Sequence, residues 1–131
     1  SVTSFNMLRK DGMEVENENI KNPLNQAKDS FVAKSFSEHD IPTVASTDYM
    51  RVYSEQIRPY LDSSYYTLGT DGFGRSDSRA KLREFFEVDA KSIVMTAAYA
   101  LHKEGQLNKK ELQKIYKEIK VNKNKISPWN T

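Results

Sequence analysis

Two short strand-like runs, separated by one helix-length segment, constrain the fold of this chain more than any other feature. Residues 41–46 (IPTVAS) and 65–68 (YYTL) are short, apolar and bounded by turn residues, which is typical of buried strands. Pro42 stands at the start of the first run, where a missing N–H costs least. The segment between the runs has helical spacing, so a crossover helix should make the two strands parallel neighbours.

The segments before and between these strands carry weaker helical signals. Ser4 or Thr3 is expected to cap a short helix that stops at Asp11-Gly12. Residues 13–40 are mostly polar and predict a long surface excursion. Within it, a short helix after Asp29 or Ser30 should turn Phe31, Val32 and Phe36 inward. The helix between the strands should be capped by Thr47 or Asp48, with one inward face of Tyr49, Val52, Tyr53, Gln56, Ile57 and Tyr60.

The C-terminal third has the clearest helical signals. Leu82, Phe85 and Phe86 give one helix an apolar face. Asp89 is expected to cap a second helix, with Val94, Ala97, Ala98 and Leu101 on its apolar face, and Gly105 should end it. Asn108 and Glu111 form a capping-box pattern that predicts a third helix. The order strand, helix, strand, helix predicts an α/β layer architecture with largely parallel strands.

Length and composition fit a single domain over residues 1–131. A chain of 131 residues buries about two-thirds of its unfolded surface. The net charge of +2 is too small to indicate a nucleic-acid partner, and no apolar run approaches the roughly 18 residues that span a membrane. The absence of cysteine excludes disulfides and thiolate catalysis and fits a cytoplasmic protein. The opening SVTS resembles the end of a strand, so we expect a fragment of a longer protein.

The glycine-rich loop that follows the second strand is the candidate site. Its sequence TLGTDGFGRSDS occupies residues 67–78, beyond the carboxyl end of a strand, where ligands bind in parallel sheets. The candidate residues are Gly69, Asp71, Gly72, Gly74, Arg75, Ser76 and Asp77.

Two interpretations of this loop compete. In a phosphate site the glycines would expose backbone N–H groups, and Arg75 would supply the cation. However, the spacing G-x-x-G-x-G matches neither the Walker nor the dinucleotide pattern, and Asp71 and Asp77 would repel phosphate. In a structural site the loop is a turn followed by a helix cap at residues 76–78. The structural interpretation is favoured, with at least one glycine at positive φ.

No catalytic, cofactor-binding or metal-binding residue is predicted elsewhere. His39 and His102 are the only histidines, and they do not form a pair at ligand spacing. Ser76 and Ser78 have no neighbouring histidine, which argues against a nucleophile. The lysine-rich C-terminus is expected to be a solvated tail rather than a nucleic-acid arm.

A family resemblance extends over nearly the whole chain. The segments ASTDYMRVYSEQIRPY and LGTDGFGRSDSRAKLREFFEVD, together with the opening SVTSF and residues 9–12, resemble the C-terminal part of the homodimeric bacterial type of pyruvate dehydrogenase. Phe73-Gly74-x-Ser76, followed by Leu82, Phe85 and Phe86, is similar to the corresponding region of transketolases. A transketolase origin remains an alternative, although Asp77 stands where that family usually has glycine. A stand-alone phosphate-binding module using residues 69–74 is a second alternative.

The resemblance implies a three-layer α/β/α fold with a mixed, largely parallel sheet, truncated here at its N-terminus. It also implies a thiamine-diphosphate and magnesium enzyme that decarboxylates pyruvate and reductively acetylates a lipoyl group. In the family, the cofactor lies between other domains, and no family catalytic residue has a counterpart here. The implied partners are the remainder of the same chain, the second subunit of a homodimer and the dihydrolipoyl acetyltransferase component. This fragment should be noncatalytic and should bind neither cofactor nor metal.

Overall fold

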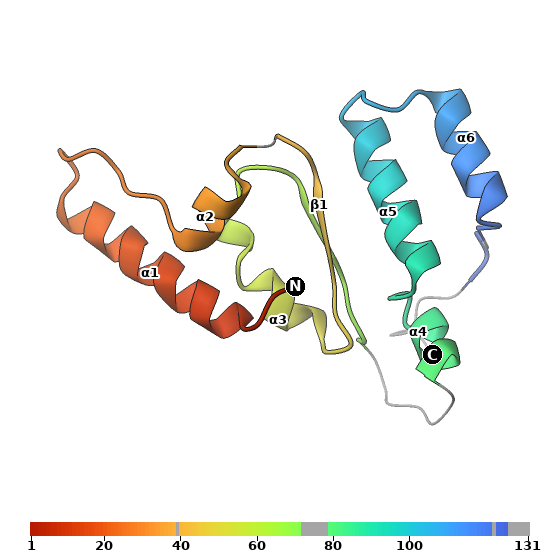
Figure 1. The fold of residues 1–131 in the computed structure, drawn as a ribbon, viewed down its shortest axis with the longest axis horizontal. Coiled ribbons are helices and arrows are strands. Elements are labelled where there is room, and N and C mark those ends of the chain that lie inside the picture. The colour runs from red at the N-terminus through yellow and green to blue at the C-terminus, as the bar shows by residue number, and fades with distance from the viewer. Residues whose placement is uncertain (39, 72–78, 122, 126–131) are drawn as a thin grey trace.

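The computed structural model describes residues 1–38, 40–71, 79–121 and 123–125. In chain order, these residues form α1 (Phe5–Lys21), α2 (Phe31–Phe36), β1 (Thr43–Ser46), α3 (Arg51–Glu55), the 3₁₀ helix η1 (Arg58–Tyr60), β2 (Tyr65–Leu68), α4 (Arg79–Phe85), α5 (Ala90–Lys103) and α6 (Lys109–Glu118). Figure 1 shows the sheet between α1, α2 and α3 on one side and α4, α5 and α6 on the other. We call α1, α2, α3 and η1 the N-terminal layer. We call α4, α5 and α6 the C-terminal layer. This α/β/α layering confirms the expected fold class.

The sheet consists of two parallel strands within the described residues. Thr43 is paired with Tyr65, and the register continues to Ser46 and Leu68. A backbone hydrogen bond closes each end: Thr43 N donates to Ser64 O at 2.8 Å, and Thr47 N donates to Leu68 O at 3.0 Å. The predicted parallel pairing is therefore confirmed. The described part of the sheet contains no antiparallel strand.

Successive side chains of each strand serve opposite layers, as the two-residue period of a strand requires. Ala45 and Tyr65 contact the N-terminal layer, where Val32 and Ile57 are buried. Val44 and Leu68 contact the C-terminal layer. The partners of that second cluster are Leu82, Phe85, Phe86, Val88 and Ile93. One strand pair thus organises two separate apolar clusters.

Helix α1 is longer than the sequence indicated. Ser4 caps it, since its Oγ accepts a hydrogen bond from Met7 N at 3.2 Å. However, the helix does not stop at Asp11-Gly12 but continues to Lys21, so the surface excursion predicted for 13–40 is wrong for 13–21. Gly12 is buried, and a Cβ placed there would lie 2.5 Å from the ring of Tyr60. This glycine permits close packing inside a helix rather than ending one.

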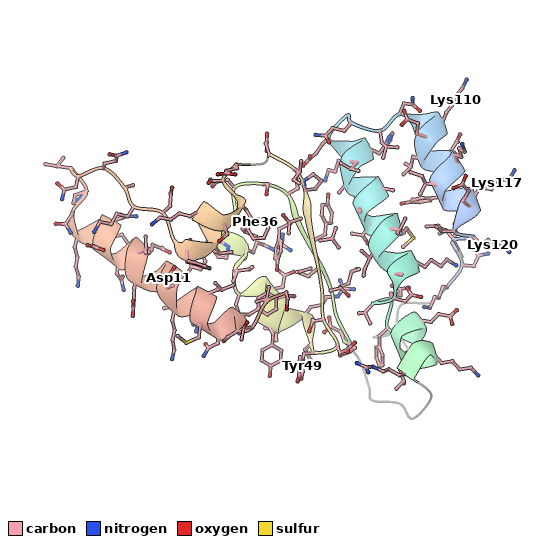
Figure 2. All side chains as sticks on the ribbon, viewed as in Figure 1. Asp11, Phe36, Tyr49, Lys110, Lys117 and Lys120 are labelled. Atoms are coloured by element: carbon pink, nitrogen blue, oxygen red, sulfur yellow. The ribbon has the colours of Figure 1, made fainter. Side chains whose placement is uncertain are left out.

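Helix α2 begins where the sequence predicted, but its apolar face was misassigned. Ser30 Oγ accepts from Ala33 N at 3.3 Å. Asp11 on α1 adds a second cap, because its Oδ2 accepts from Phe31 N at 2.7 Å. Val32 is buried as expected, whereas Phe31 is 65% exposed and Phe36 is also exposed. Figure 2 shows Asp11 on the side of α1 that faces α2.

The segment of α3 and η1 follows the predicted inward face only in part. It begins at Arg51, after an N-cap residue that makes no side-chain cap bond, so neither Thr47 nor Asp48 caps it. Tyr49 is 73% exposed, and Val52 and Tyr53 are about half exposed. Ile57 is buried and Tyr60 packs against the same cluster, as expected. Ser54 is also buried, although it was not predicted. The prediction fails for Tyr49, Val52 and Tyr53, which are at least half exposed.

The C-terminal layer follows its local signals closely. Asp89 Oδ1 accepts from Ser92 N at 2.9 Å and caps α5, while Asn108 Oδ1 accepts from Glu111 N at 2.9 Å and caps α6. Gly105 has φ of +80° and ends α5, with Gln106 N bonded to Leu101 O at 2.9 Å. Val94 is the exception on the expected face of α5, since it is exposed. Among the described helices, none is long and apolar enough to cross a membrane.

Candidate functional site

The candidate site lies at the carboxyl ends of β1 and β2, as the sequence placed it. Of its residues, Gly69 and Asp71 are described and sit together beside the β1–α3 connection. The remaining candidates (Gly72, Gly74, Arg75, Ser76 and Asp77) lie outside the described residues.

Gly69 provides room for a close backbone approach. A Cβ placed on it would lie 2.7 Å from Arg51 N and 2.9 Å from Tyr49 O. These neighbours are main-chain atoms, which cannot move aside as a flexible side chain can. Gly69 does not have positive φ, which among the described glycines occurs only at Gly105. The expected turn conformation is thus not the reason for this glycine. The prediction of a positive φ also concerns Gly72 and Gly74, which lie outside the described residues.

Asp71 caps α3 from a distance of twenty residues in sequence. Its Oδ1 accepts from Arg51 N at 3.1 Å, and its Oδ2 lies 3.4 Å from Arg51 Nε. The carboxylate therefore accepts from a backbone N–H at the start of α3, which has no acceptor within the helix, and it also lies beside a guanidinium. Asp71 belongs to the loop that the structural interpretation describes as a turn, and its carboxylate caps the helix that precedes β2.

Thr70 completes the attachment, and nothing in the sequence pattern pointed to it. Its N donates to Tyr49 O at 2.9 Å, and its Oγ1 donates to Asp48 O at 2.6 Å. Residues 69–71 together bind the connection formed by residues 47–51. We call this arrangement the loop staple. It joins the ends of the two strands, so it fixes the position of α3 over the sheet.

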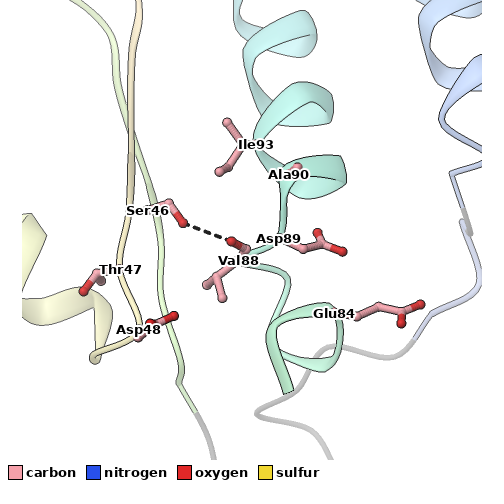
Figure 3. Close-up of a pocket in the computed structure, with 8 residues that line it drawn as sticks. All are labelled: Ser46, Thr47, Asp48, Glu84, Val88, Asp89, Ala90 and Ile93. Carbon is pink, nitrogen blue, oxygen red and sulfur yellow. Dashed lines mark hydrogen bonds between the residues drawn. The ribbon is translucent and has the colours of Figure 1, made fainter. Parts of the chain in front are cut away.

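A pocket of about 670 Å³ lies beside the loop staple, between β1 and the start of α5. Its lining residues are Ser46, Thr47, Asp48, Glu84, Val88, Asp89, Ala90 and Ile93 (Figure 3). Ser46 Oγ donates to Val88 O at 3.2 Å across the pocket. The pocket is lined by acidic side chains, and the Asp89 carboxylate is already held by Ser92 N and, at 2.7 Å, by Ser92 Oγ.

A second polar cluster joins β2 to α3 and η1, and the sequence analysis did not predict it. Glu55 accepts from Arg58 through Oε2 at 2.6 Å and Oε1 at 2.8 Å, and its Oε1 also accepts from Thr67 Oγ1 at 2.6 Å. Arg58 Nη1 donates to Tyr65 O at 2.7 Å. Tyr65 OH donates to Ser54 O at 2.7 Å. These groups connect α3, η1 and β2 in one network, which we call the Arg58 clamp.

The Arg58 clamp shifts two pKa values. The hydrogen bonds from Arg58 lower the pKa of Glu55 to about 2, while partial burial acts in the opposite direction. Burial raises the pKa of Tyr65 to about 12, and the nearby Glu55 charge acts in the same direction. Both shifts keep these groups in one protonation state at neutral pH. A group locked in this way holds structure and is poorly suited to exchange protons with a substrate.

The remaining candidates for metal or acid–base chemistry have structural roles. His102 Nδ1 lies 2.8 Å from Leu107 O, within the turn between α5 and α6. His39 lies outside the described residues. Throughout the described ranges, no three His, Cys, Asp or Glu side chains gather where they could hold a metal ion.

Comparison with known proteins identifies the relatives of this chain. Residues 1–89 match the family described as "Transketolase-like TK C-terminal domain". The match covers both strands and includes the loop staple and the Arg58 clamp.

The chain is similar over nearly its whole length to proteins named pyruvate dehydrogenase E1 component. It is 45% identical over 129 residues to that of Pseudomonas aeruginosa, covering 98% of this chain and 15% of the relative. The identity is 43% over 129 residues for Escherichia coli strain K12, covering 98% and 14%. It is 43% over 127 residues for Cupriavidus necator, covering 97% and 14%. The chain thus spans only 14–15% of the length of these relatives, while the resemblance seen in the sequence is confirmed. The chain belongs to the family of transketolase-like C-terminal domains.

Proposed function

We propose that this chain is the C-terminal domain of a thiamine-diphosphate-dependent pyruvate dehydrogenase. The single observation that carries the proposal is the identity of 40–45% to proteins named pyruvate dehydrogenase E1 component, over 97–98% of this chain. The parent enzyme would decarboxylate pyruvate in the cytoplasm and transfer the two-carbon unit to a lipoyl group of the acetyltransferase component. Thiamine diphosphate would supply the carbanion that attacks the keto carbon.

Within that enzyme, residues 1–131 would form one noncatalytic domain. The described residues do not fit a magnesium diphosphate. The pocket at the strand ends presents Asp48, Glu84 and Asp89, which repel an anion, and Asp71 is already engaged by Arg51. The cofactor would therefore be held by other parts of the enzyme. The role of this domain would be structural, in the packing of the homodimer and in docking of the acetyltransferase.

The first partner of this domain would be the remainder of its own chain. Val44 and Ser46 alternate with the β1 residues that face β2, so their backbone N–H and C=O groups point away from β2. No described residue bonds to these groups. A strand from the longer polypeptide would pair there and extend the sheet beyond β1.

The parent activity is tested on the full-length protein. We expect pyruvate to drive reduction of ferricyanide only when thiamine diphosphate and magnesium are both added. Replacing pyruvate with xylulose 5-phosphate and ribose 5-phosphate tests the transketolase alternative in the same preparation. Ketol transfer without pyruvate oxidation would overturn the proposal.

The noncatalytic role is tested with Asp71→Ala in the same enzyme. We expect a lower melting temperature with an unchanged KM for pyruvate, because Asp71 caps α3 and its carboxylate is engaged by Arg51. The phosphate-module alternative makes a different forecast. It requires that phosphate, pyrophosphate or a nucleotide raise the melting temperature of residues 1–131, and that Arg75→Ala abolish this rise.

A further inference from the structure

The outer edge of β2 is the side of that strand that faces away from β1. Ladder bonds at Ser64 and Leu68 show that the even-numbered residues of β2 face β1. The backbone groups of Tyr65 and Thr67 consequently point outward, away from the sheet. An outward row of N–H and C=O groups is a template for pairing with another strand.

The sequence of β2 makes that edge prone to self-pairing. The strand reads YYTL, which has high β propensity, no charge and no proline. A second copy would present the same edge, and two identical edges can pair antiparallel about a twofold axis. Such pairing needs both the N–H and the C=O of each outward residue.

One side chain already occupies this edge. Arg58 Nη1 donates to Tyr65 O at 2.7 Å, and its guanidinium carbon lies 5.1 Å from the centre of the Tyr65 ring. The Arg58 side chain is 47% exposed, so it lies at the rim of the molecule. Glu55 fixes it through two hydrogen bonds of 2.6 and 2.8 Å. The guanidinium is therefore held in place even when no second strand is present.

We propose that Arg58 closes the outer edge of β2 against strand addition by a second copy of this chain. A competing strand would have to displace a charge-assisted hydrogen bond and leave Glu55 without its partner. With Tyr65 O occupied, only Thr67 retains a free pair of outward backbone groups in the described strand, which is too little for a ladder. Among the described residues, no side chain bonds to the outer edge of β1, so the two edges of this sheet differ within the described part of the chain. The inference does not depend on the proposed function.

The test compares Arg58→Ala with Arg79→Ala in the full-length protein. Arg79→Ala removes the same charge from an exposed arginine, whose partner is Asp48, at 3.9 Å, after the carboxyl end of β1. Sedimentation velocity over a concentration series should show self-association tightened about tenfold or more by Arg58→Ala. Arg79→Ala should behave as the wild type. Equal self-association of folded Arg58→Ala and Arg79→Ala would overturn the proposal.

Two further measurements separate edge closure from simple loss of stability. Hydrogen exchange at the Tyr65 and Thr67 amides should slow in the Arg58→Ala assembly, whereas loosening of β2 would speed it. Adding Thr67→Pro removes an outward N–H without touching the ladder to β1, so it should reverse the new association. Persistence of the association in the double variant would place it elsewhere and refute the proposal. If Arg58→Ala fails to fold, Arg58→Lys carries the same comparison, since a lysine lacks the fork that binds Glu55 and Tyr65 together.

Discussion

The two layers that cover the sheet are attached by different means. The N-terminal layer shares an apolar cluster with the sheet, and it is held in addition by two polar networks that join separate elements, the loop staple and the Arg58 clamp. The C-terminal layer is built from locally capped helices that meet the sheet through an apolar cluster and one hydrogen bond, from Ser46 Oγ to Val88 O. A polar, long-range attachment has strict geometry, while an apolar one tolerates adjustment. We therefore expect substitutions in the N-terminal layer to be the more damaging of matched pairs.

The largest effect should come from Gly69→Ala in the loop staple. The added Cβ would meet Arg51 N at 2.7 Å, and main-chain atoms at that distance have to shift. We expect a loss of about 3 kcal/mol in the free energy of unfolding, at the upper end of overpacking effects. Gly12→Ala is the matched control. The three atoms nearest its Cβ belong to the Tyr60 side chain, which can shift more easily than a main chain, and alanine favours a helix. A loss of about 1 kcal/mol is therefore expected from urea unfolding.

The next effect should come from Asp71→Ala, which removes the long-range cap of α3. We expect a loss of about 1.5 kcal/mol, because Arg51 loses both its N–H acceptor and its ion pair. Asp71→Asn retains an acceptor for the N–H and should lose less. If the two variants melt at the same temperature, the capping bond contributes nothing.

Asn108→Ala provides the corresponding test in the C-terminal layer. This local cap of α6 should be worth about 1 kcal/mol, since Asn108 Oδ1 meets only Glu111 N. Asn108→Asp should retain the stability. The comparison of layers is contradicted if Asn108→Ala costs more than Asp71→Ala in the same denaturant series.

A smaller effect should appear in the pH dependence of the Arg58 clamp. The pKa of Glu55 is lowered from 4.5 to about 2, so its ionised form stabilises the folded state. This contribution is complete above about pH 4.5 and is lost as the pH falls toward 2. Because an exposed ion pair is weak, we expect about 0.5 kcal/mol. The difference in unfolding free energy between wild type and Glu55→Gln should shrink over that interval. A constant difference from pH 6 to pH 2.5 would contradict the assigned pKa.

At alkaline pH, we expect stability to decrease as the pH rises, which is opposite to the trend expected at acidic pH. Burial raises the pKa of Tyr65 from 10.0 to about 12, which means that the folded state retains the phenol proton. Stability should fall as the pH rises from 10 toward 12, and Tyr65→Phe should remove this dependence. Denaturant titrations at several alkaline pH values measure it.

No effect at all is expected from cofactor addition. Thiamine diphosphate with magnesium should neither release heat in calorimetric titration of residues 1–131 nor raise their melting temperature. Saturable stoichiometric binding would show that this chain contributes to the cofactor site after all.

The sequence predicted those features whose partners lie within one helical turn. Asp89, Gly105 and Asn108 each act on a backbone group a few residues away, so a local pattern contains the whole interaction. The two strands were also recognisable, since four residues of β-favouring sequence between turn signals define each one.

The polar attachments of the N-terminal layer could not be predicted in this way. Asp71 bonds a residue twenty positions earlier, and no pattern marks that pairing. Tyr49 and Val52 were predicted to face inward because their side chains are apolar, but both are exposed. The small residue Ser54 is buried instead, and its carbonyl accepts a hydrogen bond from the Tyr65 hydroxyl. Of the candidate site residues, Gly69 and Asp71 lie in the loop after β2, and close packing explains the glycine better than turn geometry.

The loop staple has a consequence for biosynthesis. The ribosome releases α3 before it releases Asp71, so the nascent helix has no side-chain cap while residues 52–70 are being made. A helix as short as five residues is unstable without such support. We therefore expect the first half of the chain to remain uncommitted until Asp71 leaves the exit tunnel. The N-terminal layer would then complete its folding only after Asp71 has been synthesised and has left the ribosome.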